Sequence, residues 1–117
     1  MRFLLFVAVL SFAPGAVHAQ WNKVDQKTEL MGLIDGKTLR RMGIRLQVFD
    51  NGKIEGRAFG RDVTGEWSWQ GGYFCRNLVW GKRPIAYNCQ WVGAKGKSKM
   101  RFQSDKGTGM FADFRVE

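Results

Sequence analysis

The stretch DVTGEWSWQGGYFCRNLVWGKRPIAYNCQWV, residues 62–92, predicts three consecutive β-strands at the centre of the fold. It holds four of the five tryptophans, both tyrosines and both cysteines of the chain. Trp67 and Trp69 alternate with polar residues, which is the period of two expected of a strand with one buried face. Gly-rich turns then separate this strand from two more, at 73–80 and 85–92.

The two cysteines predict a disulfide that sets the pairing of these strands. Cys75 and Cys89 form an even pair, which indicates a disulfide in an exported chain. If they lie directly opposite each other, the turn between their strands is Gly81–Arg83. Independently of the cysteines, Gln70–Gly72 is expected to form a three-residue turn before the strand at 73–80. One face would then carry Trp67, Trp69, Tyr73, Cys75, Val79, Ile85, Tyr87, Cys89 and Trp91.

The aromatic residues of that face have two interpretations. Tryptophans beside a disulfide are typical of a core, whereas exposed ones could form a platform on which bases or sugars stack. Both interpretations apply to Trp67, Trp69, Tyr73, Tyr87 and Trp91. The opposite face of the strand at 73–80 is also apolar apart from Arg76, because Phe74, Leu78 and Trp80 lie there. This second apolar face requires a cover.

The rest of the chain predicts an all-β fold with a short N-terminal helix. The helix is expected at about 25–35, with Asp25 as N-cap and Gly36 after its end. Alternating stretches predict further strands at 44–48, 54–60, 99–102 and 110–116. About seven strands joined by short turns indicate an antiparallel meander. We expect a curled sheet or small barrel, lipocalin-like or avidin-like, with a flatter sheet covered by the helix as the alternative.

The N-terminus predicts export. Residues 1–19 combine Arg2, an apolar run and a Val-His-Ala ending, the pattern of a cleavable signal peptide cut after Ala19. The apolar run is shorter than the roughly 20 residues that cross a bilayer. Residues 20–117 are then a single disulfide-bonded β domain, periplasmic or secreted, with no transmembrane segment.

Cleavage would remove the only histidine, His18, together with Arg2. The remaining 18 basic and 10 acidic residues give a net charge of +8, against +9 for the whole chain. Without histidine, Ser-His-Asp and Cys-His catalysis and histidine metal sites are excluded. No GxGxxG motif marks a dinucleotide site. We therefore predict no catalytic residue, no cofactor and no metal site.

Carboxylate chemistry is the enzymatic option that this composition leaves open. Asp62 and Glu66 share a strand face, but four residues separate them by about 13 Å. Glycosidase carboxylates lie within about 10 Å of each other. A cross-strand pair such as Glu55 with Asp62 remains open, and solvated surface acids are the favoured interpretation.

Basic residues spaced by two indicate an anion-binding candidate: Lys95, Lys97, Lys99 and Arg101. In an extended strand they would line one face at intervals of about 6.6 Å. Such a face suits an anionic envelope polymer, a lipid head group or an acidic protein, and no specific nucleic acid is expected. Alternatively, these lysines only prevent an edge strand of the sheet from pairing with a strand of another molecule.

Four segments resemble a family of short secreted bacterial proteins: GRAFG (56–60), VTGEWSWQGGYFCR (63–76), YNCQ (87–90) and RFQSDKGTG (101–109). The resemblance covers most of residues 20–117. Many members carry the automatic name dihydrodipicolinate reductase, so the resemblance implies a reductase that binds a nicotinamide cofactor. No established catalytic residues come with the family, and none are carried over.

These observations favour a non-enzymatic periplasmic or secreted module with a binding or envelope-accessory function and an anionic partner. The alternative is an enzyme, either a dihydrodipicolinate reductase-like protein or a carboxylate-based hydrolase. A nicotinamide titration separates the two classes, because only the reductase is expected to bind that cofactor.

Overall fold

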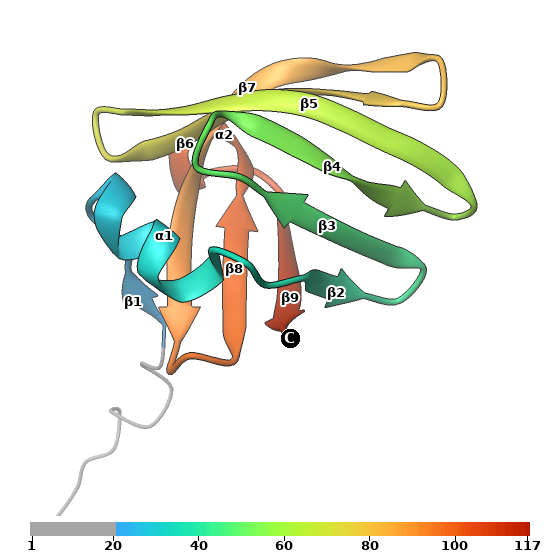
Figure 1. Ribbon diagram of the computed structural model, residues 1–117. Helices are drawn as coiled ribbons and strands as arrows, with labels where there is room; N and C mark the ends of the chain where they lie inside the picture. The colour runs from blue at the N-terminus through green and yellow to red at the C-terminus, as the bar shows by residue number, and fades with distance from the viewer. Residues whose placement is uncertain (1–20) are drawn as a thin grey trace, which may run out of the picture.

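The computed structural model describes residues 21–117, which form a closed antiparallel β-barrel with a helix at one end (Figure 1). The predicted signal peptide lies outside the described residues. The elements are β1 (Asn22–Lys23), α1 (Lys27–Ile34), β2 (Leu39–Arg41), β3 (Ile44–Val48), β4 (Lys53–Ala58), β5 (Arg61–Gln70), β6 (Tyr73–Trp80), β7 (Arg83–Lys95), β8 (Lys99–Gln103), α2 (Ser104–Gly107) and β9 (Phe111–Val116).

The barrel is a meander of eight strands, β2 to β9, that closes on itself. Each strand pairs with its neighbours in sequence, and β9 returns to pair with β2. This seam is short: Leu39 faces Val116 and Arg40 faces Arg115, with two backbone hydrogen bonds between Thr38 and Glu117 beside them. The expected small all-β barrel is confirmed, and the flatter sheet is wrong. β1 adds to β7 outside the ring.

All seven expected strands are present, and two short ones were not predicted. β1 and β2 contain two and three residues, too few to display an alternating pattern. No helix within residues 21–117 has the length and apolar character needed to span a bilayer.

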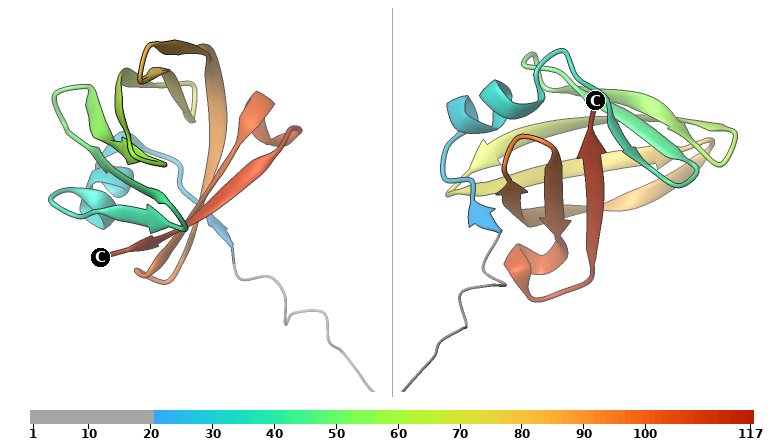
Figure 2. Two further views of the ribbon diagram at one scale, coloured as in Figure 1. Left: turned by 90° about the vertical axis from the view of Figure 1, so that its right-hand side faces the viewer. Right: turned by 90° about the horizontal axis from the view of Figure 1, so that it is seen from below.

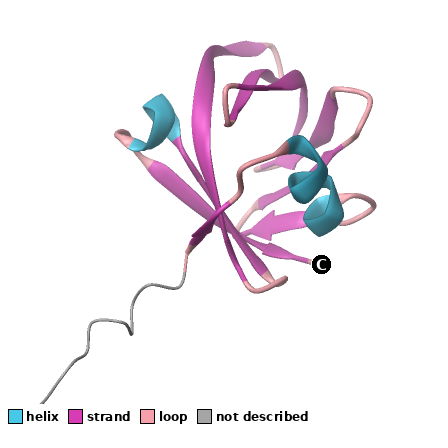
Figure 3. Cartoon of the chain, turned by 90° about the vertical axis from the view of Figure 1, so that its left-hand side faces the viewer, coloured by secondary structure: helices cyan, strands magenta, loops and turns pink. Residues whose placement is uncertain are grey.

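Helix α1 closes one end of the barrel, and its prediction is confirmed (Figures 1 and 3). Leu30 and Ile34 are fully buried and belong to the main core cluster. Gly36 follows the helix with φ of +74°, as expected of a residue just past a helix end. The expected cap was wrong by one position, because the N-cap is Gln26 and the Asp25 backbone N–H donates to Glu29 at 3.0 Å.

The disulfide between Cys75 and Cys89 is confirmed, and the two residues pair directly across β6 and β7. The predicted turns, however, are each one residue too long. β5 and β6 are joined by Gly71-Gly72 alone, so Trp69 faces Phe74 rather than Tyr73. A shift of one residue moves a whole strand's side chains to the other face of the sheet.

The predicted common face is therefore wrong for β6, and on β7 it is wrong for Tyr87, Cys89 and Trp91. Trp67 and Trp69 of β5 point inward, as expected, but their inward neighbours on β6 are Phe74, Arg76, Leu78 and Trp80. The residues that alternate with these, Tyr73, Cys75 and Val79, lie on the outer face. The disulfide therefore joins two strands on the outside of the barrel.

A β-bulge in β7 changes the second predicted register. Arg76 faces Asn88 and Leu78 faces Ile85, so Ala86 and Tyr87 together oppose the single residue Asn77. Beyond the bulge Val79 faces Pro84, not Ile85, and the turn shortens to Gly81-Lys82. The bulge also turns the Ala86 carbonyl toward Arg76, which donates to it at 2.8 Å.

Candidate functional site

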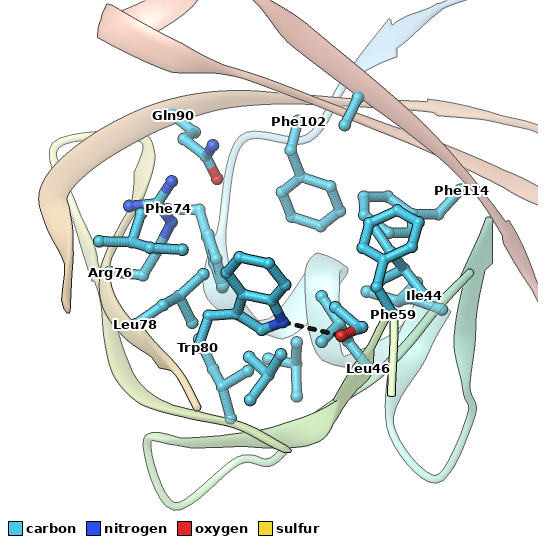
Figure 4. A pocket seen from close by; sticks show the side chains of 17 residues that line it. Ile44, Leu46, Phe59, Phe74, Arg76, Leu78, Trp80, Gln90, Phe102 and Phe114 are labelled. Carbon is cyan, nitrogen blue, oxygen red and sulfur yellow. Dashed lines mark hydrogen bonds between the residues drawn. The ribbon is translucent and has the colours of Figure 1, made fainter. Parts of the chain in front are cut away.

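The barrel contains an apolar cavity of about 360 Å³, to which all eight strands contribute (Figure 4). This volume lies at the lower end of the roughly 300–1,000 Å³ typical of small-molecule sites. Most of the wall consists of aliphatic and aromatic side chains, among them Leu46, Ile54, Leu78, Trp80 and Phe102. The arrangement suits an apolar ligand of modest size.

A chain of aromatic rings forms the floor of the cavity. Trp67 stacks on Phe74 with centroids 5.2 Å apart, and Phe74 meets Phe102 edge to face at 5.2 Å. Phe102 meets Phe114 in the same way at 5.9 Å. Trp67 belongs to this layer but does not line the cavity, and the Lys27 amine at the start of α1 lies 5.3 Å from its ring. The floor thus separates the cavity from the helix end.

The opposite end of the barrel carries the connections β2–β3, β4–β5 and β6–β7 and the α2 segment between β8 and β9 (Figure 2). The cavity reaches the surface there, because Phe59 and Ile85 line it and are both exposed. Two hydrogen bonds of 2.8 Å join Asn88 to Asp105 and tie α2 to β7. Access to the cavity is therefore from the side opposite α1.

Phe59 stands at the rim in a strained conformation. It lines the cavity, yet 66% of its surface is exposed. With φ values of +50° and +81°, Phe59 and Gly60 form a two-residue hairpin turn that favours Asn-Gly. The Phe59 ring lies over Gly43, and the backbone N–H of Phe59 donates a hydrogen bond to the Gly43 carbonyl at 2.8 Å. A bulky residue at positive φ is a genuine outlier, and such outliers cluster at functional sites.

Two polar side chains interrupt the apolar wall, Arg76 on β6 and Gln90 on β7. They lie side by side in Figure 4, and only 9% of Gln90 is exposed. The Trp80 indole donates to the Ala58 carbonyl at 2.7 Å, whereas no hydrogen bond within residues 21–117 involves the Gln90 side chain. The Gln90 amide is thus free to bond a ligand, and a buried amide without a partner costs free energy.

Arg76 is the only charged residue that lines the cavity. Partial burial lowers the pKa of its guanidinium, which nevertheless stays protonated because arginine does not lose its proton in proteins. One donor serves the Ala86 carbonyl, and no ion pair within residues 21–117 involves Arg76. A half-buried cation without a counter-ion favours an anion beside it.

The cavity offers a fixed cation, an amide and aromatic walls, and no carboxylate or histidine among residues 21–117 lines it. The two acids considered for hydrolysis lie on the outer face in ion pairs: Asp62 with Arg57 at 2.6 Å and Glu66 with Lys53 at 3.3 Å. Glu55 faces Thr64, not Asp62.

The predicted basic stripe is not one continuous strand. Residues 96–98 form the β7–β8 turn, so Lys97 lies on the turn while Lys95 faces Lys99 across the hairpin. The Arg101 guanidinium donates two hydrogen bonds to Asp113, at 2.7 and 2.9 Å. These hydrogen bonds raise the pKa of Arg101. Its guanidinium also lies 4.5 Å from the Trp21 ring. The structure thus brings Lys95, Lys99 and Arg101 together in one surface hollow beside Trp21, with Lys95 and Arg101 over the same ring, and leaves Lys97 apart on the turn.

A larger cationic feature crosses the outer face of the barrel. Six basic residues on six adjacent strands lie directly opposite one another in succession, a set we call the cation row: Lys95, Lys99, Arg115, Arg40, Arg45 and Arg57. Like charges in opposed positions destabilise a sheet. Glu117 reduces the repulsion between Arg40 and Arg115 by forming an ion pair with each of them. The hydrogen bonds that these two arginines donate lower the pKa of Glu117.

The aromatic residues proposed as core or platform divide between the two faces. Trp67 is buried in the floor, and Trp69 packs against the core with its indole donating to the Asp25 carbonyl at 3.3 Å. Tyr73, Tyr87 and Trp91 lie outside, so the five residues form no single platform.

The cavity residues Arg76, Gln90 and Phe59 were missed in the sequence interpretation. A signal for one of them was present, because Arg76 alternates with Phe74, Leu78 and Trp80 on an otherwise apolar face. For Gln90 and Phe59 no pattern in the sequence marks a site.

Comparison with known proteins adds no relative. The chain matches no protein-family model, no curated protein and no solved structure. The resemblance to short secreted bacterial proteins therefore stays an expectation.

Proposed function

We propose that this protein is a non-enzymatic binding module that holds a small amphiphile inside its barrel. The apolar body of the ligand would occupy the cavity, and its acidic group would lie against Arg76 and Gln90. The observation that carries the proposal is the Arg76 guanidinium, which has no ion pair within residues 21–117 and is the one charge among those residues that lines the cavity. This keeps the anionic partner expected from the net charge but places it in the cavity.

We further propose that the protein acts outside the cytoplasm, in the periplasm or after secretion. The disulfide between Cys75 and Cys89 supports this, because disulfides persist in oxidising compartments and are rare elsewhere.

The proposal predicts that an acidic amphiphile binds more tightly than its neutral ester. The probe is dansylaminoundecanoic acid, titrated against residues 20–117 and followed by energy transfer from Trp80, which lines the cavity. The methyl ester is titrated in parallel. In Arg76→Met the affinity for the acid should fall about 10- to 100-fold, because hydrogen bonds to charged groups contribute roughly 1.5–3 kcal/mol. Affinity for the ester should change little.

The matched control is Arg45→Met, which removes the same charge from the outer face, where Arg45 has no ion pair within residues 21–117. Equal affinity for acid and ester in the wild type would contradict the role of Arg76. Absence of saturable binding of both probes would contradict the proposal as a whole. Saturable binding of a nicotinamide cofactor instead would support the reductase alternative.

A second candidate function is binding of an anionic envelope polymer on the cation row, favoured by the succession of six opposed cations. Within residues 21–117, no ion pair involves Lys95, Lys99 or Arg45, so these three can contact a polyanion. A linear polyanion laid across the strands would meet successive charges about 5 Å apart.

The row predicts that retention on heparin depends on position as well as on net charge. The double variant Lys99→Glu/Arg45→Glu should elute at much lower salt than the wild type, because it reverses two charges in the row. The control Lys27→Glu/Lys37→Glu carries the same net charge but alters the end of the barrel near α1. Equal elution of the two double variants would show that heparin senses only total charge.

A further inference from the structure

We infer that the open end of the barrel docks on a membrane surface that contains anionic lipids, so that the cavity faces the bilayer. Docking itself stands independently of the cavity ligand. The additional step, exchange of an amphiphile between bilayer and cavity, rests on the proposed function.

Three of the four connections around the opening carry an exposed apolar side chain, and the fourth is followed by one near the start of β7. Met42 lies in the β2–β3 turn and is 90% exposed, and Met110, which precedes β9, is 86% exposed. Phe59 occupies the β4–β5 turn, and Ile85 follows the β6–β7 turn; both also line the cavity. We call these four residues the rim residues.

The same four connections carry cations. Arg41, Arg61 and Lys82 lie in three of these connections or at their edges, and Lys106 lies in the fourth, with its amine 5.3 Å from the ring of Tyr73 on the outer face. Within residues 21–117, no ion pair involves any of these four. The Arg61 guanidinium lies 5.1 Å from the ring of Trp80, which places a cation directly over the cavity wall.

The closed end differs in both respects. Acids and cations are mixed around α1: Lys23 pairs with Asp25 and Lys27 with Asp50, while Glu29, Asp35 and Lys37 lie nearby. None of the large hydrophobic side chains exposed within residues 21–117 lies in a connection of that end. The barrel thus has one end with exposed apolar tips and cations outside ion pairs, and one end without such tips where acids offset the cations. The first end is the better match to the negative surface potential of an anionic leaflet.

The spacing of the apolar residues favours a bilayer over a protein partner. The rim residues are single side chains, three in separate connections and one near the start of β7, whereas a protein partner is usually met by one contiguous packed patch. Long basic side chains can keep their charges at lipid phosphates while neighbouring apolar tips enter the acyl region. An aromatic residue at the strained position of Phe59 fits this role, because a loop tip that inserts needs apolar surface where turn geometry favours asparagine.

The test is cosedimentation of residues 20–117 with vesicles of phosphatidylcholine alone or with 30% phosphatidylglycerol. The wild type should bind the anionic vesicles at least tenfold more tightly. Met42→Ser/Met110→Ser should weaken this binding about tenfold while leaving the affinity for the dansylated acid in solution unchanged, because neither residue lines the cavity. Tyr87→Ser, which removes an exposed aromatic from the outer face, is the matched control and should bind like the wild type.

Two further variants separate fold from docking. Phe59→Asn should weaken vesicle binding without lowering the melting temperature, because asparagine tolerates the positive φ of this turn. Arg61→Gln/Lys82→Gln should weaken binding to anionic vesicles, whereas Lys27→Gln/Lys37→Gln should not.

The outcomes distinguish the two proposals. Failure of the wild type to bind anionic vesicles, or binding that the rim variants leave intact, overturns docking. Loss of vesicle binding in Lys99→Glu/Arg45→Glu alone would assign the lipid contact to the cation row and also overturn it. Vesicle binding without any binding of the dansylated probes keeps docking and contradicts the cavity proposal.

Discussion

Loss of the disulfide is expected to lower the free energy of unfolding by about 3 kcal/mol, because the bridge closes a loop of about 15 residues in the unfolded chain. The change is Cys75→Ala together with Cys89→Ala. Alanine is chosen because Cys75 is 1% exposed, and a serine hydroxyl buried there would add a penalty of its own. Urea denaturation of the oxidised wild type and of the double variant measures the difference.

Reduction provides the control for this result. Dithiothreitol should destabilise the wild type by a similar amount and leave the double variant unaffected. If the double variant unfolds within 0.5 kcal/mol (about the error of such measurements) of the oxidised protein, the bridge has no role in stability. Intact mass before and after alkylation establishes the oxidised state of the starting material.

Gly65→Ala is expected to cost about 2–3 kcal/mol, the upper part of the range for overpacking. Gly65 lies where β5 passes close to β6, and a Cβ added there would overlap the Asn77 carbonyl oxygen and the Leu78 side chain. The carbonyl belongs to the backbone of a paired strand, so it cannot move aside without disturbing the ladder. Glycine inside a strand often marks such a close approach.

The matched control is Gly32→Ala in α1, where no atom lies within 4 Å of the added Cβ. That change should stabilise the protein by roughly 0.5–1 kcal/mol, because alanine is the better residue in a helix interior. Thermal and urea unfolding of the two variants should therefore show opposite signs. A stabilising effect of Gly65→Ala would mean that β5 and β6 are less closely paired than the structure shows.

The fold was predictable from the sequence because alternation and turn residues act locally. The strands, the helix and the disulfide follow from patterns within ten residues or from cysteine chemistry. The register between paired strands was harder to predict. The sequence allows a three-residue turn at Gln70-Gly71-Gly72 or a two-residue turn at Gly71-Gly72, and the two turns place different residues opposite each other. The structure uses the shorter one. The bulge at Ala86 and Tyr87 left no mark in the alternation of β7 that sequence analysis could use.

The candidate site was missed for the same reason. The expected inward face of β6 began at Tyr73, and the actual one begins at Phe74, so Arg76 was assigned to the wrong side of the strand. The cation row was also out of reach, because it joins residues as distant as Lys99, Arg40 and Arg57 that meet only through the pairing of strands. Single-strand patterns do not contain that information.

The short seam between β2 and β9 has a consequence for how the chain reaches its native state. Of the eight pairings that close the barrel, seven join consecutive strands across connections of a few residues, and only β2–β9 joins segments separated by residues 42–110. The cost of bringing chain ends together rises with the length between them, so this pairing is the one slow, non-local event in an otherwise local assembly. The β6–β7 hairpin that carries both cysteines can form before the barrel closes. The disulfide can therefore form first, and it then reduces the number of chain conformations from which β2 and β9 have to pair.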